Sequence, residues 1–216
     1  MKTPMVLAAA VLALGAAAPA AAQIRIPPVR LIGGIGVVDG SPVFLASVPS
    51  GGQVIARHHP ATALQLGLET TSPVRGVDLR LNLQHSNPQL RLSGGGDTPA
   101  SIDQDVYRTG VNTLTLDAAI HLPRVLDSHP YVLAGAGVTR FDYKQGYYQG
   151  SNQPVVPEDR TTPTLHLGVG TAWNVGRYDL FVEASALKYP RGAGLTTLYK
   201  QGGASFTAGF RVPLHR

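Results

Sequence analysis

Two pairs of neighbouring residues carry side chains that acyl transfer would use. His85 is followed by Ser86, and Ser128 is followed by His129. A serine nucleophile needs a histidine base within hydrogen-bond reach and an acid that orients the histidine. Neighbours on a strand point to opposite faces, and the chain has no Gly-x-Ser-x-Gly elbow. These pairs therefore predict no catalytic site.

Histidines also raise the question of a metal. His121 and His166 fall on polar faces of separate segments, where Asp117 and Glu183 would be available as further ligands. The chain has neither HxH nor HExxH spacing in these segments. We therefore interpret both as hydrogen-bonded residues of a polar interior. The chain has no Cys, which excludes disulfides and thiol chemistry. The sequence predicts neither a metal nor a cofactor.

Charged side chains on strand-like segments form the more informative set. A charge buried without a partner is costly, so charges of both signs must pair wherever one face of a segment is enclosed. We expect such a network to fill a narrow interior. Its candidate members are Asp78, Arg80, Asp117, Glu183 and Arg211.

The segments that position these charges alternate with a period of two. Between Val77 and Gln84 every odd residue is aliphatic and every even residue is polar. Such alternation predicts strands with one apolar face. The expected strands are 30–38, 62–71, 76–86, 109–122, 130–143, 163–174, 178–188 and 204–214.

The connections between these strands are long and short in turn. The long ones are 39–61, 87–108, 144–162 and 189–203, and the short ones are 72–75, 123–129 and 175–177. Membrane barrels have short periplasmic turns and longer external loops. The pattern predicts an all-β fold, a closed eight-stranded antiparallel up-and-down transmembrane β-barrel. Residues such as Ser93-Gly94-Gly95-Gly96-Asp97 favour irregular loops in the long connections.

A soluble sandwich or lipocalin-like barrel would alternate too, with its apolar face inward. Several expected strands reach ten residues, which suits a tilted membrane crossing, whereas strands of soluble domains peak at about 5–6. The polar faces carry both signs of charge, which suits an enclosed interior. Aromatic residues also gather at both ends of the strands, as interfacial girdles do. They are Tyr131, Trp173 and Tyr178 at one end and Phe141, Tyr143, Tyr189 and Phe206 at the other.

The N-terminus has the pattern of a secretory signal. Lys2 precedes an apolar core at 5–18, and Pro19 and three alanines follow. We expect 1–22 to be a cleaved signal peptide and 23–216 to be one barrel domain. The net charge of +5 is spread along the chain without a basic cluster, so we expect no nucleic-acid partner.

Several segments resemble the small bacterial outer-membrane β-barrel family of the OmpA, OmpX and OmpW type. The likeness is carried by Pro130-Tyr131-Val132-Leu133-Ala134-Gly135-Ala136-Gly137-Val138, by Leu167-Gly168-Val169-Gly170-Thr171-Ala172-Trp173, by the turn Asn174-Val175-Gly176-Arg177 and by Leu180-Phe181-Val182-Glu183-Ala184. The resemblance implies a monomer in the outer membrane whose partners are lipid, lipopolysaccharide and the barrel-assembly machinery. That machinery reads an aromatic residue in the last strand, and Phe210 is the candidate.

Three functions fit this resemblance. The first is a non-enzymatic structural or interaction protein that displays its loops at the cell surface. The second is a narrow channel for small or apolar solutes, as in the OmpW type, and the third is a lipid-modifying outer-membrane enzyme. The segment 188–203 contains no acid, and cations there could contact the phosphates of lipopolysaccharide. Those cations are Lys188, Arg191 and Lys200.

Overall fold

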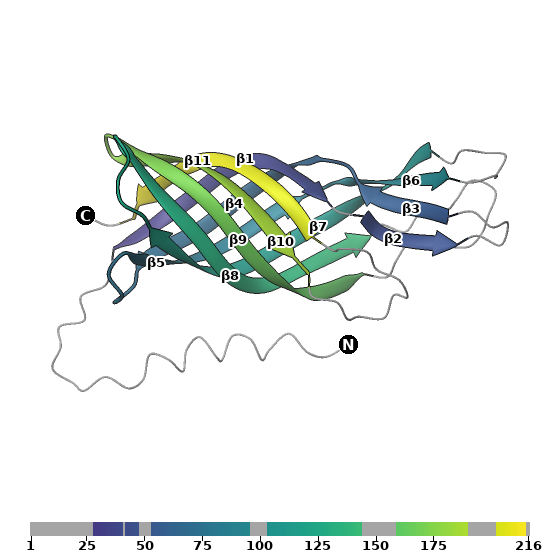
Figure 1. Cartoon of the computed structure of the whole chain (residues 1–216), viewed down its shortest axis with the longest axis horizontal. Helices are drawn as coiled ribbons and strands as arrows, with labels where there is room; N and C mark the ends of the chain where they lie inside the picture. The colour runs from purple at the N-terminus through teal and green to yellow at the C-terminus, as the bar shows by residue number, and fades with distance from the viewer. Residues whose placement is uncertain are drawn as a thin grey trace, which may run out of the picture.

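Eight strands close into an antiparallel barrel, which confirms the fold predicted from the sequence (Figure 1). The computed structural model describes residues 28–40, 42–47, 53–95, 103–143, 159–189 and 202–214. The expected signal peptide, Arg191 and Lys200 lie outside these ranges. The barrel strands are β1 (Val29–Gly40), β4 (Ala61–Thr71), β5 (Val77–Ser86), β7 (Asp103–His121), β8 (Ser128–Tyr143), β9 (Arg160–Val175), β10 (Tyr178–Lys188) and β11 (Gly202–Pro213).

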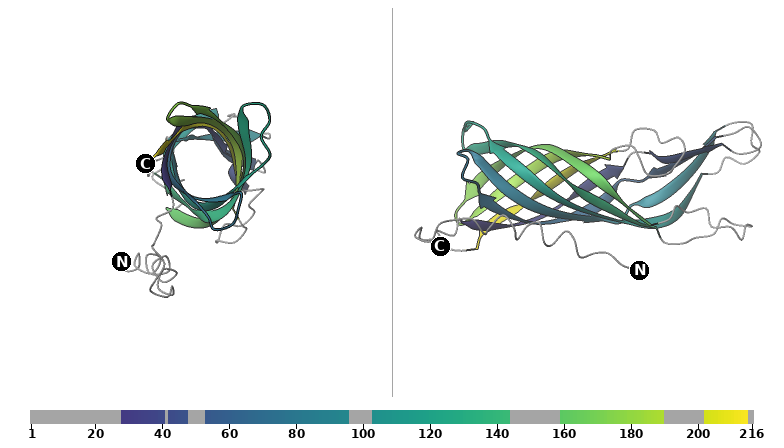
Figure 2. Two further views of the ribbon diagram at one scale, coloured as in Figure 1. Left: turned by 90° about the vertical axis from the view of Figure 1, so that its left-hand side faces the viewer. Right: turned by 90° about the horizontal axis from the view of Figure 1, so that it is seen from below.

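The barrel strands follow one another around the ring in chain order. Each pairs with the next, and β11 returns to pair with β1. The ring is seen end-on in Figure 2. Short turns join β4 to β5, β7 to β8 and β9 to β10 at one end, which we call the short-turn end. The long connections leave from the opposite end.

A second sheet extends beyond the barrel at the end with the long connections (Figure 1). It consists of β2 (Pro42–Ser47), β3 (Gln53–His58), β6 (Gln89–Gly95) and the first residues of β7. We call it the extension sheet. The prediction of irregular loops was therefore wrong at Ser93, Gly94 and Gly95, which pair with β3. The ladder gives their backbone groups partners, and this outweighs their low strand propensity.

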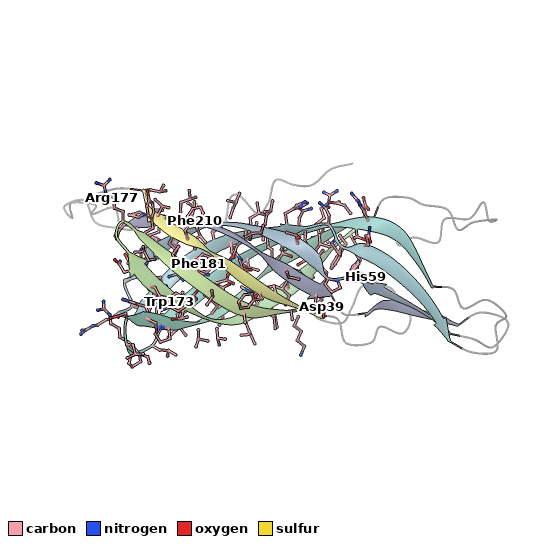
Figure 3. All side chains as sticks on the ribbon, turned by 90° about the horizontal axis from the view of Figure 1, so that it is seen from above. Asp39, His59, Trp173, Arg177, Phe181 and Phe210 are labelled. Carbon is pink, nitrogen blue, oxygen red and sulfur yellow. The ribbon has the colours of Figure 1, made fainter. Side chains whose placement is uncertain are left out.

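The barrel is polar inside and apolar outside. On β5 the aliphatic residues Leu79, Leu81 and Leu83 are exposed, while the intervening Arg80 and Asn82 are buried. Figure 3 shows side chains standing outward along the whole barrel wall. A soluble barrel would reverse this arrangement, whereas hydrocarbon around the barrel would cover the exposed aliphatic side chains. Among the described residues no helix has the length and apolar character of a membrane-spanning helix.

The aromatic residues divide between the two faces of the wall. Trp173, Tyr178 and Phe206 are exposed, as the girdle interpretation requires. The prediction was wrong for Tyr131 and Phe141, which are buried inside the barrel. Tyr131 has room there because it faces Gly170, where an added Cβ would lie 2.4 Å from the Tyr131 ring. Glycine on one strand thus admits a large ring from its neighbour.

The turn between β7 and β8 has an unusual tip. Val125 and Ser128 pair across it, and Leu126 adopts a φ of 54°. Leucine rarely occupies this left-handed region, which glycine and asparagine tolerate far better. The Leu126 side chain is 95% exposed, so no packing within the described residues compensates the strain.

Candidate functional site in the barrel lumen

Arg80 joins two opposite walls of the lumen. Its Nε and Nη2 donate to Oε2 of Glu69 on the neighbouring strand β4, at 3.1 and 3.0 Å. Its Nη1 donates to Oε2 of Glu183 on β10 at 2.6 Å. Since β5 and β10 lie four strands apart in a ring of eight, this guanidinium spans the interior. Arg80 is 0% exposed, so these charge-assisted bonds hold it without water.

Arg211 on β11 lies beside this pair and contacts aromatic faces. Its guanidinium carbon is 4.5 Å from the ring centroid of Tyr131 and 5.4 Å from that of Phe181. Arg211 Nη1 is 3.6 Å from Oε1 of Glu69, and the Tyr131 hydroxyl donates to Glu183 at 3.1 Å. Two arginines, two carboxylates and two rings therefore fill one cross-section of the barrel, and we call this set the lumen charge network.

The network continues toward the short-turn end. Arg30 on β1 donates to Oε1 of Glu69 at 3.1 Å, and the same nitrogen lies 3.8 Å from Asp78. Asp78 in turn bonds to Nε2 of His121 at 2.9 Å. Arg30 and His121 are partly exposed, so this layer meets solvent.

A separate polar layer lies on the other side of the network. His166 Nδ1 bonds to Oδ1 of Asp117 at 2.9 Å, and the Thr115 hydroxyl donates to Oδ2 of the same carboxylate at 2.9 Å. Further along, hydroxyl groups of neighbouring strands form a chain through Thr139, which lies 2.9 Å from Thr113 and 2.7 Å from Thr164. The lumen is thus filled by hydrogen-bonded polar side chains over much of its length.

The structure divides the five candidate charges into three groups. It brings Arg80 and Glu183 together directly and places Arg211 next to them through Glu69. Asp78 reaches the network through Arg30, whereas the Asp117 carboxylate bonds to His166, although Asp117 and Arg80 are paired on neighbouring strands. Sequence reasoning left Glu69 and Arg30 out of the network. The short β4–β5 turn contained the missing signal, because it sets the register that places Glu69 opposite Arg80.

The other candidate groups have local partners. His85 bonds to the side chains of Asn112 at 2.8 Å and Asn87 at 3.0 Å, and the Ser128 hydroxyl donates to the Val125 carbonyl at 2.8 Å. Within the described ranges no group of three His, Cys, Asp or Glu residues is placed to hold a metal. Lys188 is exposed at the end of β10.

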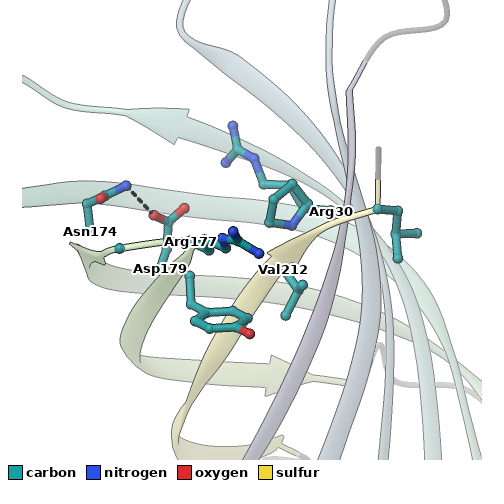
Figure 4. A pocket seen from close by; sticks show the side chains of 9 residues that line it. Arg30, Asn174, Arg177, Asp179 and Val212 are labelled. Atoms are coloured by element: carbon teal, nitrogen blue, oxygen red, sulfur yellow. Dashed lines mark hydrogen bonds between the residues drawn. The ribbon is translucent and has the colours of Figure 1, made fainter. Parts of the chain in front are cut away.

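A cavity of about 480 Å³ opens at the short-turn end of the lumen, directly below the charge network. Its lining includes Arg30, Asp78, His121, His129, Asp179 and Arg211. A second recess of about 610 Å³ shares Arg30, Asn174 and Asp179 with it and is drawn in Figure 4. There Asn174 donates to the Asp179 carboxylate at 3.0 Å.

An apolar outer wall around an enclosed polar lumen defines a class, the eight-stranded β-barrels of outer-membrane type. No family model and no curated protein matches the sequence. Among solved structures the chain is similar to Neisserial surface protein A, with a TM-score of 0.55, 11% identity, and 85% of this chain and 96% of that chain covered. It is also similar to the outer membrane protein OprG from Pseudomonas aeruginosa, with a TM-score of 0.56, 13% identity, and 88% and 97% covered. Identities this low show the fold alone.

Proposed function

We propose that the protein is a non-enzymatic outer-membrane β-barrel with a structural or interaction role. In this proposal the chain is exported by its signal peptide and is a monomer in the membrane. Its short-turn end faces the periplasm, and its long connections and extension sheet are displayed at the cell surface. The observation that carries the proposal is the lumen charge network.

The network supports a closed lumen because of where its members lie. An eight-stranded barrel has an interior only wide enough for side chains. Arg80 bridges β5 and β10 across that interior, and Tyr131 and Arg211 occupy the space beside it. Opening a path for solutes would require breaking bonds between desolvated charges. A barrel filled in this way is better suited to displaying its long connections and the extension sheet than to passing solutes.

Recordings in planar bilayers test this proposal against the channel alternative. We expect the wild type to show no steady single-channel conductance. A double variant, Arg80→Ala with Glu183→Ala, removes the bridge across the lumen and should conduct. Leu81→Ala on the lipid side is the control and should stay silent. If the wild type shows regular conductance steps as large as those of the double variant, the protein is a narrow channel.

The enzyme alternative is tested separately. Neither Ser–His pair shows a hydrogen bond between its two members, since His85 bonds to Asn112 and Ser128 bonds to Val125. We expect mass spectrometry of lipid A and phospholipids to give the same species from cells with and without the protein. A new acylated or deacylated lipid that depends on the protein would overturn the non-enzymatic proposal.

Contact with lipopolysaccharide is the further partner that we propose. Lys188, at the end of β10, and the two cations of the connection that follows it in the sequence would bind lipid phosphates, which accept strong charge-assisted hydrogen bonds. The test is the thermal unfolding of a triple Gln variant in vesicles with and without lipopolysaccharide. The wild type should gain more stability from that lipid than the variant. A matched control replaces three cations of the short turns. The triple variant replaces Lys188, Arg191 and Lys200. The control replaces Arg75, Arg124 and Arg177.

A further inference from the structure

We propose that the cavity at the short-turn end binds a small soluble oxoanion, a carboxylate or phosphate, on one edge of the Arg211 guanidinium. This goes beyond the proposed function, which needs a filled lumen but no ligand. The site lies where the lumen opens to solvent at the end that we assign to the periplasm.

The first observation is a pair of donors without acceptors. Nε and Nη2 of Arg211 are buried and have no hydrogen-bond partner among the described side chains. Arg211 is 2% exposed, so its unpaired donors carry the cost of lost hydration. Buried polar groups in folded proteins are rarely left in this state. The unsatisfied edge of Arg211 therefore indicates a partner that comes from outside the chain.

The second observation is the geometry of these donors. Nε–H and Nη2–H lie on the same edge of a guanidinium and point in parallel, which matches two oxygens of a carboxylate or phosphate. Arg80 donates through this same edge to a carboxylate, with both bonds going to Oε2 of Glu69. The rings of Tyr131 and Phe181 lie beside the Arg211 guanidinium and limit its rotation. Arg211, which lines the cavity, thus offers a pair of parallel donors held in a fixed orientation.

The third observation is the charge of the cavity. Its arginines are Arg30, Arg124 and Arg211, and its carboxylates are Asp78 and Asp179. Both carboxylates already accept hydrogen bonds, Asp78 from His121 and Asp179 from Asn174. Arg30 and Asp179 also line the neighbouring recess, which Figure 4 draws. An incoming anion would therefore meet cations that outnumber the acids, within a volume of about 480 Å³.

Enclosure by the barrel wall narrows the class of ligand. A lipid headgroup stays tethered at the outside of the wall, whereas Arg211 lies within it. A halide carries the same charge but offers a single atom, so the two hydrogen bonds that it accepts from this edge must both bend and are weaker than two bonds to separate oxygens. The geometry favours a small soluble acid that presents two oxygens on one group.

Titration calorimetry on the folded barrel in a non-ionic detergent tests the site. The probes are inorganic phosphate and acetate, added at constant ionic strength against sodium chloride. We expect saturable binding of phosphate or acetate to the wild type and much weaker binding of chloride. Arg211→Lys keeps the charge but loses the parallel donors, and it should bind at least tenfold more weakly. Arg177→Gln, in the neighbouring recess only, is the matched control and should bind as the wild type does.

A second variant protects the test against misfolding of the first. Arg30→Gln changes a partly exposed cation of the same cavity and should also weaken binding, while heat-modifiable migration on SDS gels reports folding. Equal binding by wild type and folded Arg211→Lys would overturn the proposal, as would the absence of saturable binding to the wild type. Vesicles of phosphatidylglycerol and phosphatidylcholine form the last arm. Phosphatidylglycerol could stabilise the wild type more than Arg211→Lys while free anions do not bind. That result would overturn the proposal and assign the Nε and Nη2 edge of Arg211 to a lipid headgroup.

Discussion

Replacing Glu69 with Gln removes a carboxylate that three arginines approach. Arg80 and Arg30 donate to it at 3.0–3.1 Å, and Arg211 lies 3.6 Å away. The variant keeps the shape of the side chain but removes its negative charge. Arg80 then keeps one directly bonded carboxylate, that of Glu183. Glu69→Gln therefore tests whether the lumen charges are desolvated and mutually dependent.

The size of the effect follows from burial. Removing one partner of a buried ion pair leaves an uncompensated charge and costs about 3–5 kcal/mol. Both partners are essentially unexposed here, so this range applies without a discount for solvent screening. With an m-value of about 3 kcal/mol/M, the urea midpoint should fall by about 1–2 M.

Urea titration in lipid vesicles measures this shift. Trp173 is the single tryptophan of the chain and lies at the short-turn end, so its fluorescence reports unfolding of the barrel (Figure 3). Asp142→Asn is the matched control, because it breaks a salt bridge of 2.6 Å between exposed side chains, and it should leave the midpoint unchanged.

A shift for Glu69→Gln as small as that of Asp142→Asn would refute the reasoning. It would mean that water enters the lumen and screens Arg80, Arg30 and Arg211, whatever the distances between them. The closed-lumen proposal would then lose its main support.

Three further outcomes are expected. Leu81→Arg should cost about 2–4 kcal/mol in vesicles because it faces hydrocarbon, while Asn82→Ser in the lumen should cost less, and equal losses would reject the register. Leu126→Asn should raise stability by about 1 kcal/mol by relieving the φ of 54°, and a lowered midpoint would show that the leucine makes a stabilising contact. Burial lowers the pKa of His58 from 6.5 to about 4. As the pH falls, His58 is therefore protonated in the unfolded chain before it is protonated in the folded state. The folded state should lose about 3 kcal/mol as pH falls from 6.5 through 4, and His58→Phe should remove this part of the pH dependence.

The barrel strands were predictable because a membrane imposes a pattern. The segments 62–71 and 76–86 lie between lipid and a polar lumen, so their residues alternate, and the observed bounds differ by one residue at most. The sequence does not alternate at 42–47 or 53–58, and the alternation at 89–93 covers only five residues, so the strands of the extension sheet were not predicted. The segment 131–138 has small or apolar residues on both faces, which hid the inward direction of Tyr131.

The candidate site was predictable only in its chemistry. Enclosure required the charges on alternating strands to pair, but choosing partners needed the register between strands. Glu69 faces Arg80 because of the β4–β5 turn, and Asp117 on β7 reaches His166 on β9 across Gly135 of the intervening strand β8. The lack of a partner for Nε and Nη2 of Arg211 could not be predicted, because it depends on how far each side chain reaches across the lumen.

The pairing of β1 with β11 has a consequence for the time course of folding. These strands stand at opposite ends of the described chain and join over eleven residue pairs, from Arg30 with Pro213 to Gly40 with Gly203. Contacts so distant along a chain form slowly, because most of the chain must be ordered before they can be made. Until then both strands present unpaired edges on which other chains could aggregate. Closure of this seam should therefore be a late and slow event, and the interval before it is when the chain most needs protection.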